Sequence, residues 1–149
     1  PAIAEKPEFG MTNFDAIECR IDLLSQGQTD ASAAASELLA LGEQVLELWI
    51  EARDETPGQE KREGFRLLAL HRQGARGEPS FNACRETCRE LVYHYNLIAL
   101  EPEHQDIAKR IMLAAMVAKH LCLFVGGKMA VAEIGEFCCS SRDAQAAAR

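Results

Sequence analysis

The stretch SFNACRETCRELVYHYNLIAL, residues 80–100, decides how the rest of the chain can be interpreted. Its apolar positions recur every three or four residues, as on one face of an α-helix. That face carries Cys84, Cys88, Leu91, Tyr95 and Ile98. The spacing therefore predicts a central helix whose two cysteines point into a core. Charged residues lie off this face, and we expect them to meet solvent or a polar groove: Arg85, Glu86, Arg89 and Glu90.

Helix signals also flank this stretch. Thr12 with Asp15 three residues later has the pattern of a capping box, and Gly27 ends the helix that it predicts. Thr29 or Asp30 caps a second helix that runs to about Arg53.

Further helices are expected on both sides of the central one. Thr56-Pro57-Gly58-Gln59 has the N-cap, N1 and N3 residues of a helix start, which predicts a third helix to about Gln73. A fifth helix is predicted from Pro102 to Val125, a turn at Gly126-Gly127, and a last helix from Lys128 to about Ala146. No run of alternating residues predicts a strand. The sequence thus predicts one all-α domain over residues 11–147, a bundle of five or six mostly antiparallel helices with short loops, after an arm at residues 1–10.

Composition narrows the class of protein. The chain has 149 residues, of which 48% are hydrophobic and 26% charged, as in a globular domain. Its net charge of −7 argues against nucleic-acid binding, which needs a clustered positive field. The longest apolar run, residues 111–127, is interrupted by Lys119 and His120 and is expected to be buried, with no membrane as partner. The six cysteines, without an export signal, predict reduced thiols and a cytoplasmic protein.

The cysteines of the central helix allow three interpretations. Two thiols one helical turn apart can form a redox couple or half of a soft-metal site, and they can also be small apolar residues of a core. A metal site would need more ligands, for which His94 and Cys122 are the candidates beside Cys84 and Cys88.

This arrangement is similar, over about a dozen residues, to the C-x-x-C and following histidine of alkylhydroperoxidase D-type proteins. That resemblance implies a helical thiol protein linked to peroxide reduction. Here, however, three residues separate Cys84 from Cys88, and His94 comes six residues later, so the spacing departs from the pattern of that family.

A second candidate site is a basic segment in this otherwise acidic chain. Its side chains suit a phosphate or a carboxylate, because guanidinium groups match both anions: Arg62, Arg66, His71, Arg72 and Arg76. The alternative is a solvated face that pairs with Glu43, Glu47 and Glu51. An enzyme would require a polar pocket that the third and fourth helices share.

Three functions therefore stay open. The sequence favours a non-catalytic helical module that forms a homodimer through the helix predicted from Pro102 to Val125 and binds a protein or a small anionic ligand. The first alternative is a thiol protein that uses Cys84 and Cys88 for soft-metal binding or redox chemistry. The second alternative is a small all-α enzyme that uses the region of His71, Arg72 and Arg76.

Overall fold

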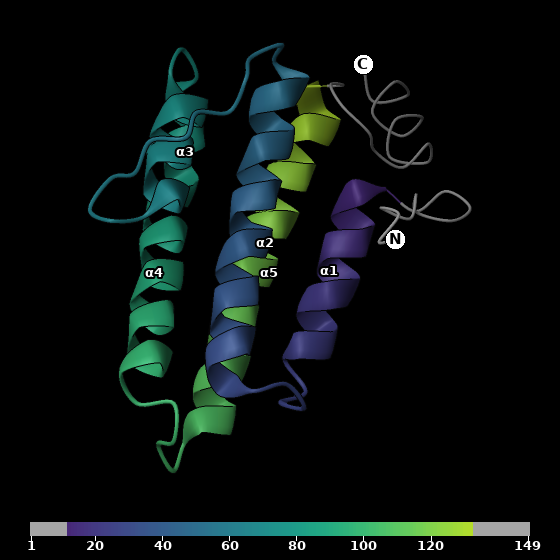
Figure 1. Ribbon diagram of the computed structural model, residues 1–149. Coiled ribbons are helices and arrows are strands. Elements are labelled where there is room, and N and C mark those ends of the chain that lie inside the picture. The colour runs from purple at the N-terminus through teal and green to yellow at the C-terminus, as the bar shows by residue number, and fades with distance from the viewer. Residues whose placement is uncertain (1–11, 133–149) are drawn as a thin grey trace, which may run out of the picture.

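The computed structural model describes residues 12–132, which form five α-helices and a short 3-10 helix with no β-strand among them (Figure 1). The predicted all-α bundle is therefore confirmed. The elements are α1 (Asn13–Leu24), α2 (Ala31–Ala52), α3 (Arg66–Ala75), η1 (Pro79–Cys84), α4 (Arg85–Leu100) and α5 (Ile107–Ala132). The arm expected at residues 1–10 and most of the last helix expected up to Ala146 lie outside the described residues.

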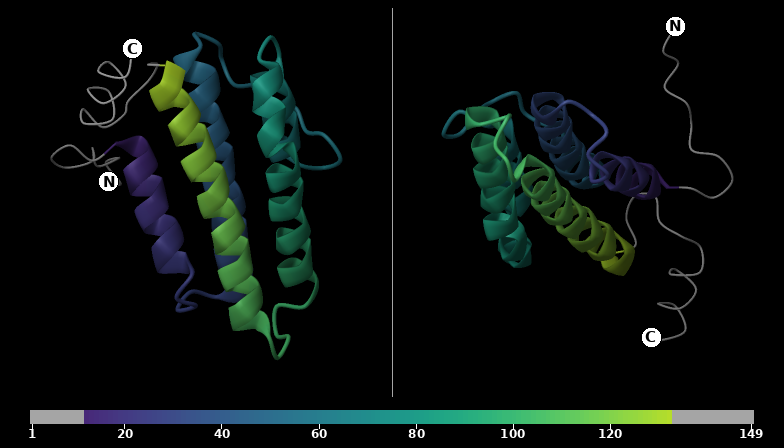
Figure 2. Two further views of the ribbon diagram at one scale, coloured as in Figure 1. Left: turned by 180° about the vertical axis from the view of Figure 1, so that it is seen from behind. Right: turned by 90° about the horizontal axis from the view of Figure 1, so that it is seen from below.

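The two longest helices, α2 and α5, pack against each other at the centre of the bundle. Helix α1 lies on one side of this pair, and α3 and α4 lie on the other (Figures 1 and 2). Both cysteines of the central stretch are buried as expected, and Leu91 and Ile98 are buried beside them. By length and composition α5 is apolar enough to cross a membrane, but one of its faces is buried in the shared core, as in a central bundle helix.

The first two helix starts follow the predicted signals. Thr12 and Asp15 form a capping box, in which each side chain accepts a hydrogen bond from the backbone N–H of the other. At α2 the cap is Asp30, whose carboxylate accepts from the Ala33 N–H at 3.1 Å. Gly27 has a φ of 73°, which is the left-handed conformation that ends α1.

The third predicted helix start is wrong. Residues 55–61 form no helix, and α3 begins only at Arg66. A tight turn precedes α3, with positive φ at Glu63 and Gly64. The segment before the turn lies along α3, because the Gly58 N–H donates to the side chain of Gln73 at 2.9 Å and Arg66 donates to the Gly58 carbonyl at 2.9 Å. The hydrogen bonds of this segment to side chains of α3 thus take the place of the backbone hydrogen bonds of a helix.

Other boundaries also differ from the prediction. The stretch before Arg85 is the 3-10 helix η1, and α5 begins at Ile107 after two turns rather than at Pro102. The turn predicted at Gly126-Gly127 is absent, because α5 continues to Ala132. A Cβ at Gly126 would lie 3.5 Å from the ring of Phe14, which is an ordinary van der Waals distance, so the contact between α1 and α5 here does not require glycine.

Candidate functional site

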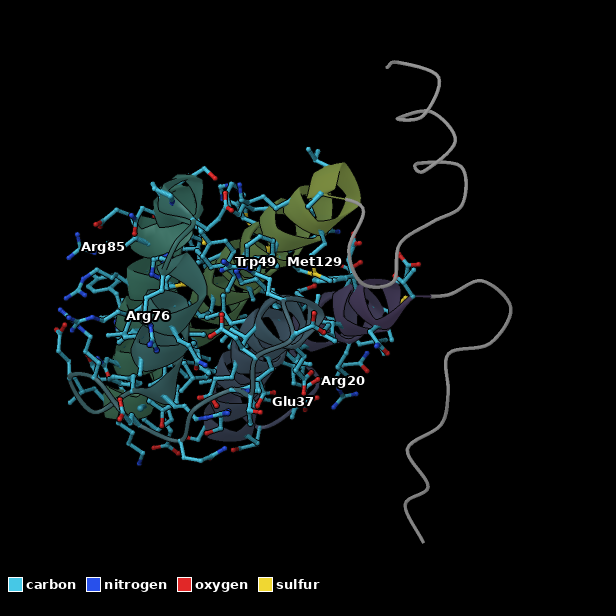
Figure 3. All side chains as sticks on the ribbon, turned by 90° about the horizontal axis from the view of Figure 1, so that it is seen from above. Arg20, Glu37, Trp49, Arg76, Arg85 and Met129 are labelled. Atoms are coloured by element: carbon cyan, nitrogen blue, oxygen red, sulfur yellow. The ribbon has the colours of Figure 1, made fainter. Side chains whose placement is uncertain are left out.

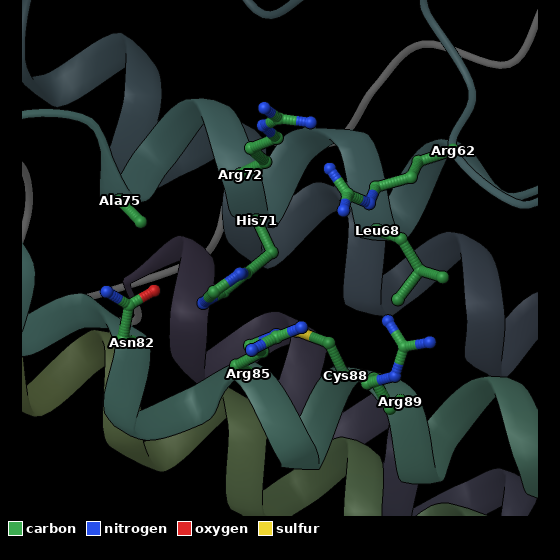
Figure 4. Close-up of a pocket in the computed structure, with 9 residues that line it drawn as sticks. All are labelled: Arg62, Leu68, His71, Arg72, Ala75, Asn82, Arg85, Cys88 and Arg89. Atoms are coloured by element: carbon green, nitrogen blue, oxygen red, sulfur yellow. The ribbon is translucent and has the colours of Figure 1, made fainter.

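A pocket of about 280 Å³ opens between α3 and α4 (Figure 4). This volume is near the lower end of the range for small-molecule sites, about 300–1,000 Å³. Its polar lining comes from the loop before α3, from α3, from η1 and from α4: Arg62, His71, Arg72, Asn82, Arg85, Cys88 and Arg89. The third and fourth α-helices thus share a polar pocket, as the enzyme alternative requires.

The pocket carries far more positive than negative charge. Arg89 donates to both carboxylate oxygens of Glu63, at 2.9 and 3.0 Å, and Arg62 lies 3.9 Å from the same carboxylate. The hydrogen bond from Arg89 lowers the pKa of Glu63, which keeps this group ionised. Among residues 12–132 no carboxylate comes within 4.0 Å of the guanidinium groups of Arg72 or Arg85. Of the four arginines that line the pocket, two therefore pair with Glu63, and two pair with no carboxylate among residues 12–132.

The buried imidazole of His71 forms part of the pocket wall. Its Nε2 lies 3.1 Å from the Phe81 carbonyl, which can only accept, so the proton is on Nε2. The ring also stacks on Phe81, with centroids 5.4 Å apart.

Aromatic packing behind His71 holds α3 against α2 and η1. Phe81 stacks on Trp49 of α2 with a centroid distance of 4.7 Å, and the Trp49 indole donates to the Gly74 carbonyl at 2.9 Å. A Cβ at Gly74 would lie only 2.9 Å from Trp49 and 3.1 Å from Phe81. Glycine is therefore needed for α3 to come this close.

Two buried free thiols lie at the base of the pocket region, where η1 meets α4. Cys84 donates to the Phe81 carbonyl at 3.3 Å, and Cys88 lines the pocket itself. Hydrogen bonds, first from Cys88 and then from His71, lower the pKa of the Cys84 thiol to about 6. The same interaction, together with burial, raises the pKa of Cys88. These opposite shifts make Cys84 the more acidic thiol of the pair.

Only part of the predicted basic segment reaches this pocket. Arg62, His71 and Arg72 do, but Arg66 pairs with Glu47 at 2.8 Å and Glu43 at 3.3 Å. Arg66 thus makes the pairing with Glu43 and Glu47 that the alternative interpretation expected, although its side chain is largely buried. Arg76 lies instead in a neighbouring depression with Lys61 and Gln73, which Arg62 and Arg72 also border.

Sequence reasoning missed the contribution of the central helix to this pocket. Arg85 and Arg89 were expected to face solvent or a polar groove, and in the structure they line the open pocket that α3 and α4 share. Asn82 was not considered. The available signal was that Arg85 and Arg89 are four residues apart, directly after Cys84 and Cys88. Residues three or four apart share a helix face, so the two arginines could be expected to face the same neighbour.

The four candidate metal ligands do not come together. Cys122 faces α1, where its thiol lies 3.6 Å from the Phe14 carbonyl, and burial raises its pKa to about 12. His94 packs against Tyr93, and desolvation lowers its pKa. Within residues 12–132 no three His, Cys, Asp or Glu side chains are grouped closely enough to hold a metal ion.

In comparisons with models of protein families, with curated proteins and with solved structures, no match to this chain was found.

Proposed function

We propose that this protein binds a small anionic ligand in the arginine pocket, which we define by Arg62, His71, Arg72, Arg85 and Arg89. The observation that supports this most directly is that four arginines line one pocket and that two of them, Arg72 and Arg85, pair with no carboxylate among residues 12–132. Arginine stays charged at all physiological pH values, so these groups repel one another unless an anion lies between them.

The chemistry of the lining favours a phosphate or a carboxylate. Guanidinium groups donate two parallel hydrogen bonds to either anion, and Asn82 adds a neutral donor. The pocket volume suits a small molecule or a single charged group. The chain as a whole carries a charge of −7, so the positive charge of this pocket is a local feature of an acidic protein.

The proposal is tested by calorimetric titration of the full chain with inorganic phosphate, sulfate and citrate at low ionic strength. We expect at least one of these anions to bind with a stoichiometry of one and to raise the melting temperature, because a ligand of the folded state stabilises it. Arg85→Gln should weaken that binding about tenfold or more, since a charge-assisted hydrogen bond contributes about 1.5–3 kcal/mol.

The matched control is Arg20→Gln. Arg20 lies on α1, on the opposite side of the bundle from Arg85, where it pairs with Glu37 (Figure 3). This exchange removes the same charge and should leave anion affinity unchanged. If both variants lose the same affinity, the loss comes from the change in net charge and not from the pocket. If none of the three anions binds, the proposal is refuted.

We also propose self-association through an apolar face of α5. The face consists of five exposed side chains, which we call the α5 stripe: Met112, Leu113, Met116, Leu123 and Val131. They are separated by intervals that place them on one side of the helix, away from the core. Large exposed apolar areas in a folded chain are typical of interaction surfaces.

A further inference from the structure

The thiol pair at the arginine pocket is a feature that anion binding alone does not use. Cys88 lines the pocket, and Cys84 lies between two residues that also line it, Asn82 and Arg85. Cys84 also lies near His71, a third lining residue, because both side chains bind the Phe81 carbonyl, at 3.3 and 3.1 Å. A small molecule held by the arginines would therefore lie next to the free thiol of Cys88, with the free thiol of Cys84 one helical turn away.

We propose that Cys84 and Cys88 carry out thiol–disulfide exchange with a small anionic disulfide, whose carboxylates the arginine pocket holds. This inference rests on the proposed anion binding and adds a reaction to it. Both thiols are almost inaccessible to solvent, at 1% and 0% exposure, so the reagent must be small and must enter through the pocket. The pocket would thus select the disulfide by both its negative charge and its small size.

Cys84 is the attacking residue. It precedes the first residue of α4 and therefore sits at the positive end of a 16-residue helix, which favours a thiolate. Its pKa, lowered to about 6 by Cys88 and His71, agrees with that position. Cys88 keeps its proton under the same conditions and is the second thiol of the reaction.

The exchange is balanced without another reactant. The Cys84 thiolate attacks one sulfur of the disulfide, the sulfur–sulfur bond breaks, and one thiolate leaves. Cys88 then attacks the Cys84 sulfur in the mixed disulfide, so that a Cys84–Cys88 disulfide forms and the second thiolate leaves. The proton of Cys88 passes to a departing thiolate. The protein dithiol loses two electrons, and the small disulfide gains them.

Two small disulfides of similar size and opposite charge test this inference: 3,3′-dithiodipropionate, with two carboxylates, and cystamine, with two ammonium groups. The full chain carries Cys19→Ser, Cys138→Ser and Cys139→Ser to limit side reactions, while Cys122 stays as a thiol of raised pKa. Trypsin cleaves after Arg85 and so separates Cys84 from Cys88, which lets mass spectrometry detect a disulfide between peptides 77–85 and 86–89.

We expect the Cys84–Cys88 disulfide to form about tenfold faster with dithiodipropionate than with cystamine at low salt, because the arginines attract one reagent and repel the other. At about 1 M salt, where the Debye length is about 3 Å, most of that preference should disappear. Arg72→Gln should slow the reaction with the anionic reagent, whereas Arg20→Gln should not. Cys88→Ser should stop the reaction at a mixed disulfide on Cys84.

The outcomes separate this inference from the proposed function. If phosphate, sulfate or citrate binds but neither disulfide oxidises the pair, the exchange reaction is refuted and anion binding stands. If both reagents react at equal rates, selection by the arginine pocket is refuted. If the disulfide forms but no anion binds in calorimetry, anion binding is refuted, and a remaining preference for dithiodipropionate would have to come from another part of the chain.

Discussion

Gly74 is the residue on which the aromatic packing behind the arginine pocket depends. A Cβ at this position would overlap the Trp49 ring at 2.9 Å, and neither Trp49 nor Phe81 has room to move in the core. We expect Gly74→Ala to lower the free energy of unfolding by about 1–3 kcal/mol, as overpacking of a core does. The comparison is Gly127→Ala, which has no atom within 4 Å and should raise stability by up to about 1 kcal/mol. Urea unfolding measures both, and equal effects would contradict the packing argument.

The ionisation of Cys84 gives a second prediction at the same scale. The ultraviolet absorbance of the thiolate should appear with a half-point near pH 6, and a Cys88→Ala exchange should move the half-point upward by removing the largest cause of the low pKa. A half-point near pH 8.5, the value of an ordinary cysteine, would contradict the geometry of the pair.

The same shift makes stability depend on pH. An unfolded cysteine ionises near pH 8.5, so below that pH the folded chain binds fewer protons than the unfolded one. The contribution of Cys84 is therefore complete above about pH 8.5 and is lost as the pH falls through about 6. Cys88 acts in the opposite direction above about pH 8.5, since its own pKa is raised. Urea unfolding should show a stability gain from pH 6 to 8.5 that is absent in Cys84→Ala.

Among the helices, α2 has an N-terminus for which the sequence gave two possible N-cap residues, Thr29 and Asp30. Asp30 accepts the hydrogen bond from the Ala33 N–H, and Thr29 lies outside the helix. We expect Asp30→Ala to cost about 1 kcal/mol of unfolding free energy. Thr29→Ala, one position earlier, should change it by less than about 0.5 kcal/mol. Similar costs for the two exchanges, measured by urea unfolding, would show that the cap is shared.

Sequence signals predicted a helix end correctly where residues close in the sequence form it. They failed where contacts with residues distant in the sequence determine the local structure. The capping box at Thr12 is complete within four residues, and its prediction is confirmed. The equivalent signal at Thr56 failed because side chains of α3 bind that loop. Gly126 was expected to turn the chain, but in the structure it lies within α5, where it packs beside Phe14.

The same reasoning explains how much of the site the sequence could predict. Arg62, His71 and Arg72 are close together along the chain, so their clustering was visible. Arg85 and Arg89 join them only because α3 packs over one flank of α4, which the spacing within a single helix cannot reveal.

For the whole molecule, the packing of the bundle does not explain why one face of α5 exposes large apolar side chains. Met116 is 62% exposed and Leu123 is 55% exposed, although the opposite face of the same helix is buried against three other helices. The five side chains of the α5 stripe are all apolar, and the exposed Lys109 and His120 lie on the same side of the helix. A second copy offers the same apolar face, and a two-fold axis would bring the two stripes together.

Sedimentation equilibrium tests this association directly. We expect the wild-type chain to be a dimer and Met116→Lys to be a monomer, because burying an unpaired ammonium group in an apolar contact costs several kcal/mol. The control is Ala40→Lys, which adds the same charge at an exposed position of α2. A dimer that persists in Met116→Lys would place the contact elsewhere, and a wild-type monomer would refute self-association. Because the arginine pocket lies between α3 and α4 and no residue of α5 lines it, anion affinity should be the same in dimer and monomer.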